Sequence, residues 1–300
     1  MSVQRPRTML GLTARLLALR YERALGPSRL ALLVVASVAA LVSARSFEHR
    51  RVERSPTPLA TFNIENDPKN GRQEAPTFEL LRTLNAAAVG VQEIVDPVAF
   101  ASAARSRLGA HWRFVHSVGE GSQRVGVLYD SDRLELLSSR QHREVVTYPG
   151  AKPMFEARLR DGATVLRMLV VHLEAGGDGA RERQRQYAAM LPVVREAVGS
   201  GERVVVLGDF NATGPEDRAE LRALSGRTNL RWASEPLSCT SYWARRDGCL
   251  GQALDHVLAS TAPSSIAVRG ACERVGCSPG ALCPAERELI SDHCPVVFDL

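Results

Sequence analysis

Acid, amide and imidazole side chains recur in this sequence where apolar, strand-like runs end. The set comprises Asn63, Glu93, His172, Asp209, Asn211, Asp255, Asp292 and His293. Buried strands tolerate carboxylates poorly, so acids placed repeatedly at the ends of such runs predict one shared site at the rim of a sheet. Carboxylate and amide oxygens suit Mg²⁺, Mn²⁺ or Ca²⁺, and imidazole beside them supplies acid–base chemistry. The combination favours metal-dependent hydrolysis of phosphate esters.

The spacing within two of these groups carries further information. Asp209 and Asn211 are two residues apart after an apolar run, so strand alternation places both side chains on one face. The structural alternative is an Asx turn. Asp292 and His293 are adjacent, and adjacent strand residues point to opposite faces, so a shared site requires a turn at that point. A lone histidine is more often structural, but the neighbouring aspartate and Asp255 favour a functional role.

Short apolar runs alternate with helical patterns from residue 58 onward. The predicted strands are Leu59–Ile64, Ala88–Val91, Arg113–Val118, Val125–Tyr129, Val165–His172, Arg203–Leu207, Asp255–Ala259 and Val296–Leu300. The predicted helices are Thr77–Asn85, Val98–Leu108 and Ala180–Val198, the second with Asp96 as N-cap and Pro97 at its first position. This order predicts one α/β domain with two packed sheets flanked by helices.

The N-terminal region has the composition of an export signal. An Arg-rich stretch precedes the apolar segment Leu30–Val42, and Ser43-Ala44 follows as a small-residue cleavage site. These thirteen predominantly apolar residues fall short of the roughly 20 that span a bilayer. We therefore expect residues 1–44 to be a signal peptide, residues 45–57 a linker and residues 58–300 the functional domain, in a secreted or periplasmic protein. A retained anchor formed by residues 30–44 and a buried helix are the alternatives.

The net charge does not by itself indicate a polyanion-binding protein. Residues 1–44 contain six Arg and one Glu and so carry the whole formal charge of +5. Residues 45–300 contain 32 basic and 32 acidic residues. A local basic patch remains compatible with nucleic-acid binding, but the overall charge gives it no support.

Six cysteines lie in the last quarter of the chain. They are Cys239, Cys249, Cys272, Cys277, Cys283 and Cys294. An even number after an export signal predicts disulfides, and we expect Cys239 to pair with Cys249 across a short loop while the others form two more bonds. A zinc site is the alternative, although the sequence lacks a C-x-x-C pair.

The order of the motifs resembles the endonuclease/exonuclease/phosphatase superfamily. The matching stretches are TFNIE at 61–65, VGVQE at 89–93, RVGVLYD at 124–130, VVHLEAG at 170–176, VVLGDFNA at 205–212, LDHVLAS at 254–260 and SDH at 291–293. The resemblance runs from about residue 58 to the C-terminus. It implies a four-layered α/β sandwich in which two mainly antiparallel sheets pack together and carry the site at their rim.

The resemblance also implies a role for each residue. Asn63 and Glu93 would bind the divalent metal, Mg²⁺ or alternatively Mn²⁺ or Ca²⁺, with Asp292 close to it. Asp209 and Asn211 would orient the attacking water and the scissile phosphate. His293 would act together with Asp255 as the base unit. His172 would contact a phosphoryl oxygen or the leaving group, and Arg124 would contact a phosphate.

These inferences predict an exported, monomeric, divalent-metal-dependent phosphodiesterase that acts on nucleic acid, with no obligate protein partner. A sphingomyelinase-like or inositol-phosphate phosphoesterase is the alternative. A lipid-directed enzyme would need an exposed aromatic or apolar hairpin, for which Leu237–Trp243 is the candidate. A non-enzymatic binding protein on the same fold is disfavoured because all the catalytic positions are occupied.

Overall fold

The computed structural model describes residues 57–300 except 120, 247, 279 and 281. The expected signal peptide, the anchor alternative at residues 30–44 and nearly all of the expected linker therefore lie outside the described residues. Within the described ranges, no helix combines the length and apolar character that crossing a membrane requires.

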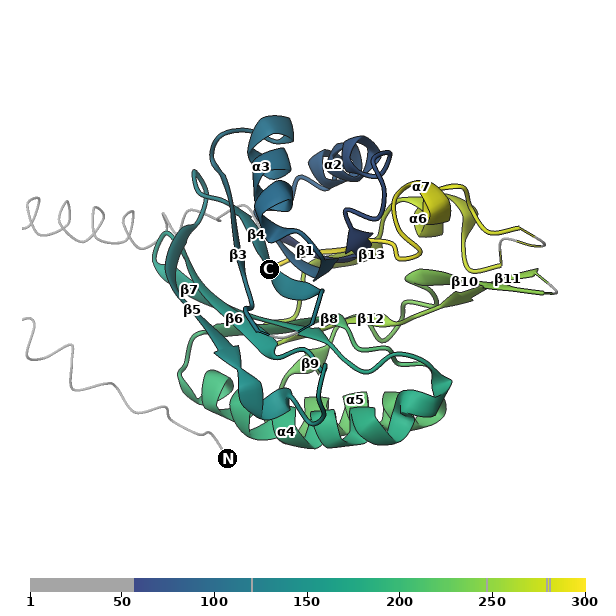
Figure 1. The fold of residues 1–300 in the computed structure, drawn as a ribbon. Coiled ribbons are helices and arrows are strands. Elements are labelled where there is room, and N and C mark those ends of the chain that lie inside the picture. The colour runs from purple at the N-terminus through teal and green to yellow at the C-terminus, as the bar shows by residue number, and fades with distance from the viewer. Residues whose placement is uncertain (1–56, 120, 247, 279, 281) are drawn as a thin grey trace, which may run out of the picture. The chain divides into compact units, whose positions relative to one another are not determined.

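Two six-stranded sheets form the centre of the domain (Figure 1). The first has the order β13 (Ser265–Val268), β14 (Val296–Asp299), β1 (Pro58–Asp67), β2 (Ala88–Ile94), β4 (Arg124–Asp130) and β3 (Trp112–His116). The second has the order β5 (Glu135–His142), β6 (Met154–Asp161), β7 (Thr164–His172), β8 (Arg203–Asp209), β12 (Asp255–Ala259) and β9 (Arg231–Trp232). Each sheet has one parallel pair at its centre, β1 with β2 and β7 with β8, and antiparallel pairs on either side.

Helices cover the outer face of each sheet, which gives the four layers expected from the sequence (Figure 1). Helices α2 (Glu74–Thr83) and α3 (Pro97–Arg107) pack on the first sheet, and α4 (Ala180–Gly199) and α5 (Pro215–Thr228) pack on the second. A third core lies between the sheets and joins side chains such as Leu59, Phe155 and Leu207. At Gly90 a Cβ atom would lie 2.2 Å from Leu207 Cδ1, so glycine lets the sheets approach closely.

The local sequence explains the main helices. Asp96 caps α3 by accepting the Val98 and Ala99 N–H groups at 3.1 and 2.9 Å, and Pro97 occupies the first turn, as predicted. In α4, the buried side chains of Tyr187, Met190 and Val194 recur at helical spacing and form a core stripe against the second sheet.

The C-terminal cysteines form three disulfides around a hairpin, β10 (Ser241–Arg245) with β11 (Gly248–Gln252), and two short helices, α6 (Ala271–Val275) and α7 (Glu286–Leu289). Two of the bonds fasten the hairpin region to the segment between α6 and α7, and the third joins α6 to the segment before β14. The bonds are Cys239–Cys277, Cys249–Cys283 and Cys272–Cys294. The expected Cys239–Cys249 bond is wrong. The hairpin register pairs Cys249 with Ala244. A Cβ atom at Gly251 would lie 3.1 Å from Cys239 Cβ and 3.0 Å from Cys277 Cα, so Cys239 and Cys277 meet beside Gly251, two residues along β11 from Cys249.

Candidate active site

Strand ends from both sheets meet at one rim. In the second sheet, Asp209 at the end of β8 is in register with His172 on β7 and with Asp255 on β12. In the first sheet, β1 and β2 contribute Asn63 and Glu93. The Asn63 amide nitrogen joins the sheets, because it donates to Asp209 Oδ2 at 3.0 Å and to Glu93 Oε1 at 3.1 Å. The sequence prediction of a shared rim is confirmed.

The backbone around the site is unusual where the strands end. Glu93 and Asn211 have positive φ values of 62° and 48°, a conformation that costs energy for a glutamate and is common at functional sites. Gly208 has φ 138°, and a Cβ atom there would lie 2.1 Å from the Val171 carbonyl oxygen of the parallel neighbour β7. Glycine is therefore required directly before Asp209.

Asp255 and His293 form the shortest contact between titratable groups in the site. His293 Nδ1 lies 2.7 Å from Asp255 Oδ2, and both side chains are buried. Thr240 Oγ1 donates to the same carboxylate oxygen at 2.7 Å. The chain bends at Asp292, as predicted, and Ser291 Oγ accepts the His293 N–H at 3.0 Å and donates to the Asn63 carbonyl at 2.7 Å.

The pKa values of the two histidines move in opposite directions. Burial, the charge of Lys152 and the charge of His293 together hold the pKa of His172 well below its usual value, so this ring is neutral. Burial also acts to lower the pKa of His293, but the carboxylates of Asp255 and Asp209 outweigh it and raise this pKa well above its usual value. The rim therefore holds one neutral imidazole and one charged imidazole.

Asp209 is the central carboxylate of the site. It lies 3.7 Å from His172 Nε2 and 3.7 Å from His293 Nε2, and it accepts the Asn211 N–H at 2.8 Å. Burial and the charge of Asp255 raise its pKa to about 7, although His293 acts in the opposite direction. The Asn211 amide in turn donates to the Leu173 carbonyl at 3.1 Å, which fixes its side chain beside Asp209.

The donor set suits a divalent cation. Glu93, Asp209, Asp255 and Asp292 converge on the rim, and among the described residues no Lys or Arg forms an ion pair with any of them. Asp209, Asp255 and His293 have ligand atoms within 4.8 Å of one another. Four carboxylates beside one charged imidazole leave net negative charge at the rim, which is the environment in which a hard cation binds. Asn63 differs from expectation, because its amide oxygen accepts the Glu65 N–H at 3.0 Å and its nitrogen faces the carboxylates. A ligand role for Asn63 requires the amide to turn over.

Arg124 does not contact the other predicted residues. Its Nη1 donates to the carbonyls of Gly121 and Gln123 at 2.7 and 3.2 Å, which ties the loop before β4. The adjacent Gln123 makes the closer connection, because its amide nitrogen donates to Glu93 Oε2 at 2.8 Å.

The sequence reasoning missed three supporting residues. Gln123 holds Glu93, Thr240 holds Asp255, and Glu65 Oε2 accepts the Asp292 N–H at 2.9 Å. Gln123 directly precedes the RVGVLYD motif, and Glu65 is the last residue of TFNIE. Their positions in or beside recognised motifs could have identified Gln123 and Glu65 from the sequence. No pattern around Thr240 indicates its role.

An α/β sandwich with carboxylates, amides and two histidines at the rim defines a class of hydrolytic enzymes. The model of the Endonuclease/Exonuclease/phosphatase family matches residues 60–293. The chain belongs to this family, whose members are metal-dependent phosphoesterases and nucleases.

Solved structures share the fold at low sequence identity. D. rerio TDP2 complexed with single strand DNA product has a TM-score of 0.66 at 16% identity, over 82% of this chain and 98% of that one. The human Nocturnin catalytic domain with bound sulfate has a TM-score of 0.61 at 19% identity, over 81% of this chain and 93% of that one. An endonuclease/exonuclease/phosphatase from Bacteroides vulgatus has a TM-score of 0.61 at 16% identity, over 82% of this chain and 98% of that one. No curated protein sequence matches this chain.

Proposed function

We propose that this protein is an exported, divalent-metal-dependent phosphodiesterase that hydrolyses nucleic acid. The observation that carries the proposal is the convergence of Glu93 and Asn63 from one sheet with Asp209, His172 and the Asp255–His293 pair from the other. Family membership supports phosphoesterase chemistry. The fold neighbour D. rerio TDP2, solved with a single strand DNA product, supports a nucleic-acid substrate.

The proposed metal site consists of Glu93, Asp292 and Asn63 after rotation of its amide. The oxygen ligands of this site suit Mg²⁺, Mn²⁺ or Ca²⁺. A divalent cation bound there would supply positive charge to the non-bridging oxygens of the scissile phosphate. Gln123 would orient Glu93 through the bond to Oε2, as outer partners commonly orient metal ligands.

The pKa directions assign the proton transfers differently from the family-based expectation. Asp209, with a pKa of about 7, is suited to accept the proton of the attacking water near neutral pH. His293 is held in its charged form by Asp255 and is suited to stabilise the charge that develops on the phosphoryl oxygens. Neutral His172 and the Asn211 amide would orient the phosphate, with His172 beside the leaving group.

Three disulfides in the described residues support export, because such bonds persist in oxidising compartments. The expected signal peptide at residues 1–44 supplies the route. Fractionation of the producing cells tests this part of the proposal. Protein lacking the leader should appear outside the cytoplasm, and uncleaved protein in washed membranes would establish the anchor formed by residues 30–44.

A lipid substrate is the second candidate, favoured by one specific observation. Trp243 on β10 is 56% exposed and Leu282 is 82% exposed, and both belong to the segment fastened by the Cys249–Cys283 bond. An exposed aromatic side chain on a hairpin, with an exposed aliphatic side chain on the segment bonded to it, suits insertion at a membrane surface. Tyr242, in contrast, is buried and donates to the Gly276 carbonyl at 2.5 Å.

One experiment separates these substrates. Purified protein with Mg²⁺, Mn²⁺ or Ca²⁺ is offered plasmid DNA, RNA, sphingomyelin vesicles and inositol phosphates in parallel. The proposal expects hydrolysis of DNA or RNA and loss of that activity with EDTA. Hydrolysis of sphingomyelin alone, reduced by Trp243→Ala, would replace the nuclease proposal with the lipid one.

A further inference from the structure

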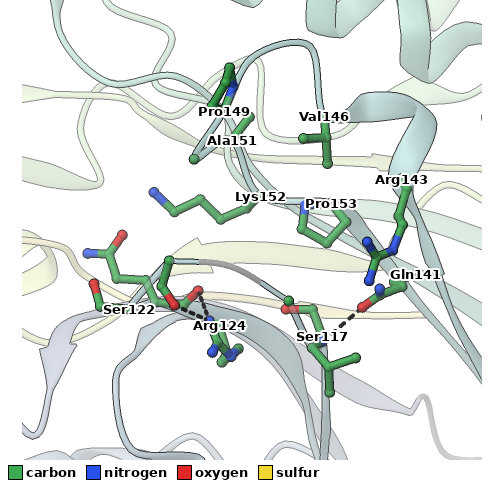
Figure 2. A pocket seen from close by; sticks show the side chains of 15 residues that line it. Ser117, Ser122, Arg124, Gln141, Arg143, Val146, Pro149, Ala151, Lys152 and Pro153 are labelled. Carbon is green, nitrogen blue, oxygen red and sulfur yellow. Dashed lines mark hydrogen bonds between the residues drawn. The ribbon is translucent and has the colours of Figure 1, made fainter.

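A cavity of about 750 Å³ lies between two loops at the edge of the sheets (Figure 2). One wall is the β3–β4 connection, from Ser117 to Arg124, in the first sheet. The other wall is the β5–β6 connection, from Gln141 to Pro153, in the second sheet and includes the 3-10 turn η1 (Arg143–Val145). A volume of this size is ample for a nucleotide unit.

The cavity adjoins the candidate active site through two of its lining residues. Gln123 lines the cavity and also donates to Glu93 at 2.8 Å. Lys152 lines it from the opposite wall, and its charge lowers the pKa of His172. A substrate bound at Glu93 and His172 would therefore extend into the cavity on that side.

The described lining of the cavity carries net positive charge. Arg124, Arg143 and Lys152 line it, and the described lining residues include no Asp or Glu; Glu120, within the first loop, lies outside the described residues. No carboxylate of the described residues forms an ion pair with Arg143 or Lys152, whereas Arg158 and Arg160 on β6 are neutralised by Glu202 and Glu135. Figure 2 shows Lys152 extending between the two loops. Cations without a local partner indicate an anionic ligand.

The remaining lining favours a sugar–phosphate backbone over a base. Val118, Val146, Pro149 and Pro153 form the apolar part, and the described lining contains no aromatic side chain on which a base could stack. Gln141 Oε1 accepts the Val118 N–H at 2.8 Å, which links the two walls.

We propose that this cavity binds the phosphate group that neighbours the scissile phosphate of a nucleic-acid strand, through Arg143 and Lys152. The inference rests on the proposed function and narrows it to substrates that carry at least two phosphate groups along one chain. Because the cavity offers no stacking surface, binding there would be insensitive to base identity. A sphingolipid has a single phosphate and would leave these cations without a ligand.

Binding to a 5′-fluorescein-labelled thymidine decanucleotide in EDTA tests the proposal without any turnover. Anisotropy titrations over a range of salt concentrations compare the full-length protein with its Arg143→Gln and Lys152→Gln variants. Each substitution should weaken binding at least tenfold at low salt and reduce the magnitude of the salt slope by about 0.7, the contribution of one contact with single-stranded nucleic acid. Lys152→Arg keeps the charge and should retain the wild-type slope.

Arg227→Gln is the matched control. Arg227 is exposed at the C-terminal end of α5, the helix whose other end follows Asn211, so it lies away from the site. Equal binding by Arg143→Gln, Lys152→Gln and Arg227→Gln would overturn the proposal.

A second measurement separates failure of this proposal from failure of the proposed function. With metal present, kcat/KM is compared for the decanucleotide and for bis(p-nitrophenyl) phosphate, a diester with one phosphate. Arg143→Gln should lower kcat/KM for the decanucleotide at least tenfold more than for the small diester. Equal losses on both substrates would refute the cavity as a neighbouring-phosphate site and leave the phosphodiesterase proposal standing. If wild-type protein cleaves neither substrate, the proposed function fails, and the binding titrations still decide the cavity.

Discussion

His293 Nδ1 lies 2.7 Å from Asp255 Oδ2, and Thr240 Oγ1 donates to that same carboxylate oxygen. One oxygen of a fully buried carboxylate thus fixes both the orientation and the charge of the imidazole. The residues come from β12 and from the bend after α7, so the contact also joins the second sheet to the C-terminal segment.

Asp255→Asn should lower kcat by about 10²–10⁴-fold with a small change in KM, because an amide no longer holds His293 in its charged form. Steady-state kinetics of Asp255→Asn, His293→Ala and the double variant provide the measurement. The two effects should be strongly non-additive, since both remove the same oriented imidazolium. Effects that simply multiply would show that the two residues act separately. Thr240→Val, which removes the second bond to Asp255, should give a smaller loss of the same kind.

Glu93→Gln should abolish activity at ordinary metal concentrations and leave the fold intact, because it removes one of the two carboxylates proposed to bind the metal. Circular dichroism and thermal unfolding check the fold, and EDTA applied to the wild type should reproduce the loss. Glu79→Gln, an exposed change on α2, serves as the control. Full activity of verified metal-free protein would refute a metal-dependent mechanism.

The disulfides should differ in their effect on catalysis. Cys239 directly precedes Thr240, whereas Cys249 lies on β11 away from the site residues. Paired Cys→Ser substitution of either bond should lower the free energy of unfolding by about 2–4 kcal/mol. Only loss of Cys239–Cys277 should also lower kcat, because the peptide that carries Thr240 is then free to move away from Asp255. Equal kcat for both paired variants, measured below their unfolding temperatures, would contradict this coupling.

Asp67 provides a prediction about pH and stability. Its side chain is buried at the end of β1, and burial, with the charges of Glu74 and Asp96, raises its pKa from 3.8 to about 6. The folded state therefore binds the Asp67 proton more tightly than the unfolded state does. The contribution of this carboxyl to stability is fully present below pH 3.8 and is lost as the pH rises through 6. Asp67→Asn should raise the free energy of unfolding at pH 7 by about 1–3 kcal/mol and give no gain near pH 3.5.

Urea unfolding of wild type and Asp67→Asn at several pH values checks this difference. Asp132→Asn, on an exposed turn, is the matched control and should show no such pH-dependent gain. A constant difference between wild type and Asp67→Asn from pH 3.5 to 7 would show that ionisation is not its cause.

Much of the fold was predictable because its strands are marked by local apolar patterns. Val165–His172 and Arg203–Leu207 are nearly continuous apolar runs, and they form the central parallel pair of the second sheet. Strands with mixed composition escaped notice: β5 reads ELLSSRQH and β6 reads MFEARLRD. Glu156 on β6 is a buried charge, paired with Arg167 and in hydrogen-bond contact with His142, and such pairing over a distance cannot be read from a local pattern.

Most of the site residues were predictable as a group because each lies at one end of an apolar run, and the structure brings these strand ends together at one rim. Their individual orientations were not predictable. The Asn63 amide turns its nitrogen toward the carboxylates, and Arg124 is tied to loop carbonyls. Both depend on backbone groups of neighbouring loops. The disulfide pairing failed for a similar reason, since the hairpin register, which separates Cys239 from Cys249, is set by tertiary contacts.

The site draws on residues from Asn63 to His293, a separation that spans nearly the whole folded domain, with Ser291 bonded directly to the Asn63 carbonyl. While the chain is being synthesised, the first sheet, the β7–β8 pair and Asp209 all emerge before the imidazole that completes the constellation. A growing chain therefore lacks the complete candidate site until residue 293 has been added and has returned to β1. Assembly of the site is thus completed only by the last few residues of the domain to leave the ribosome.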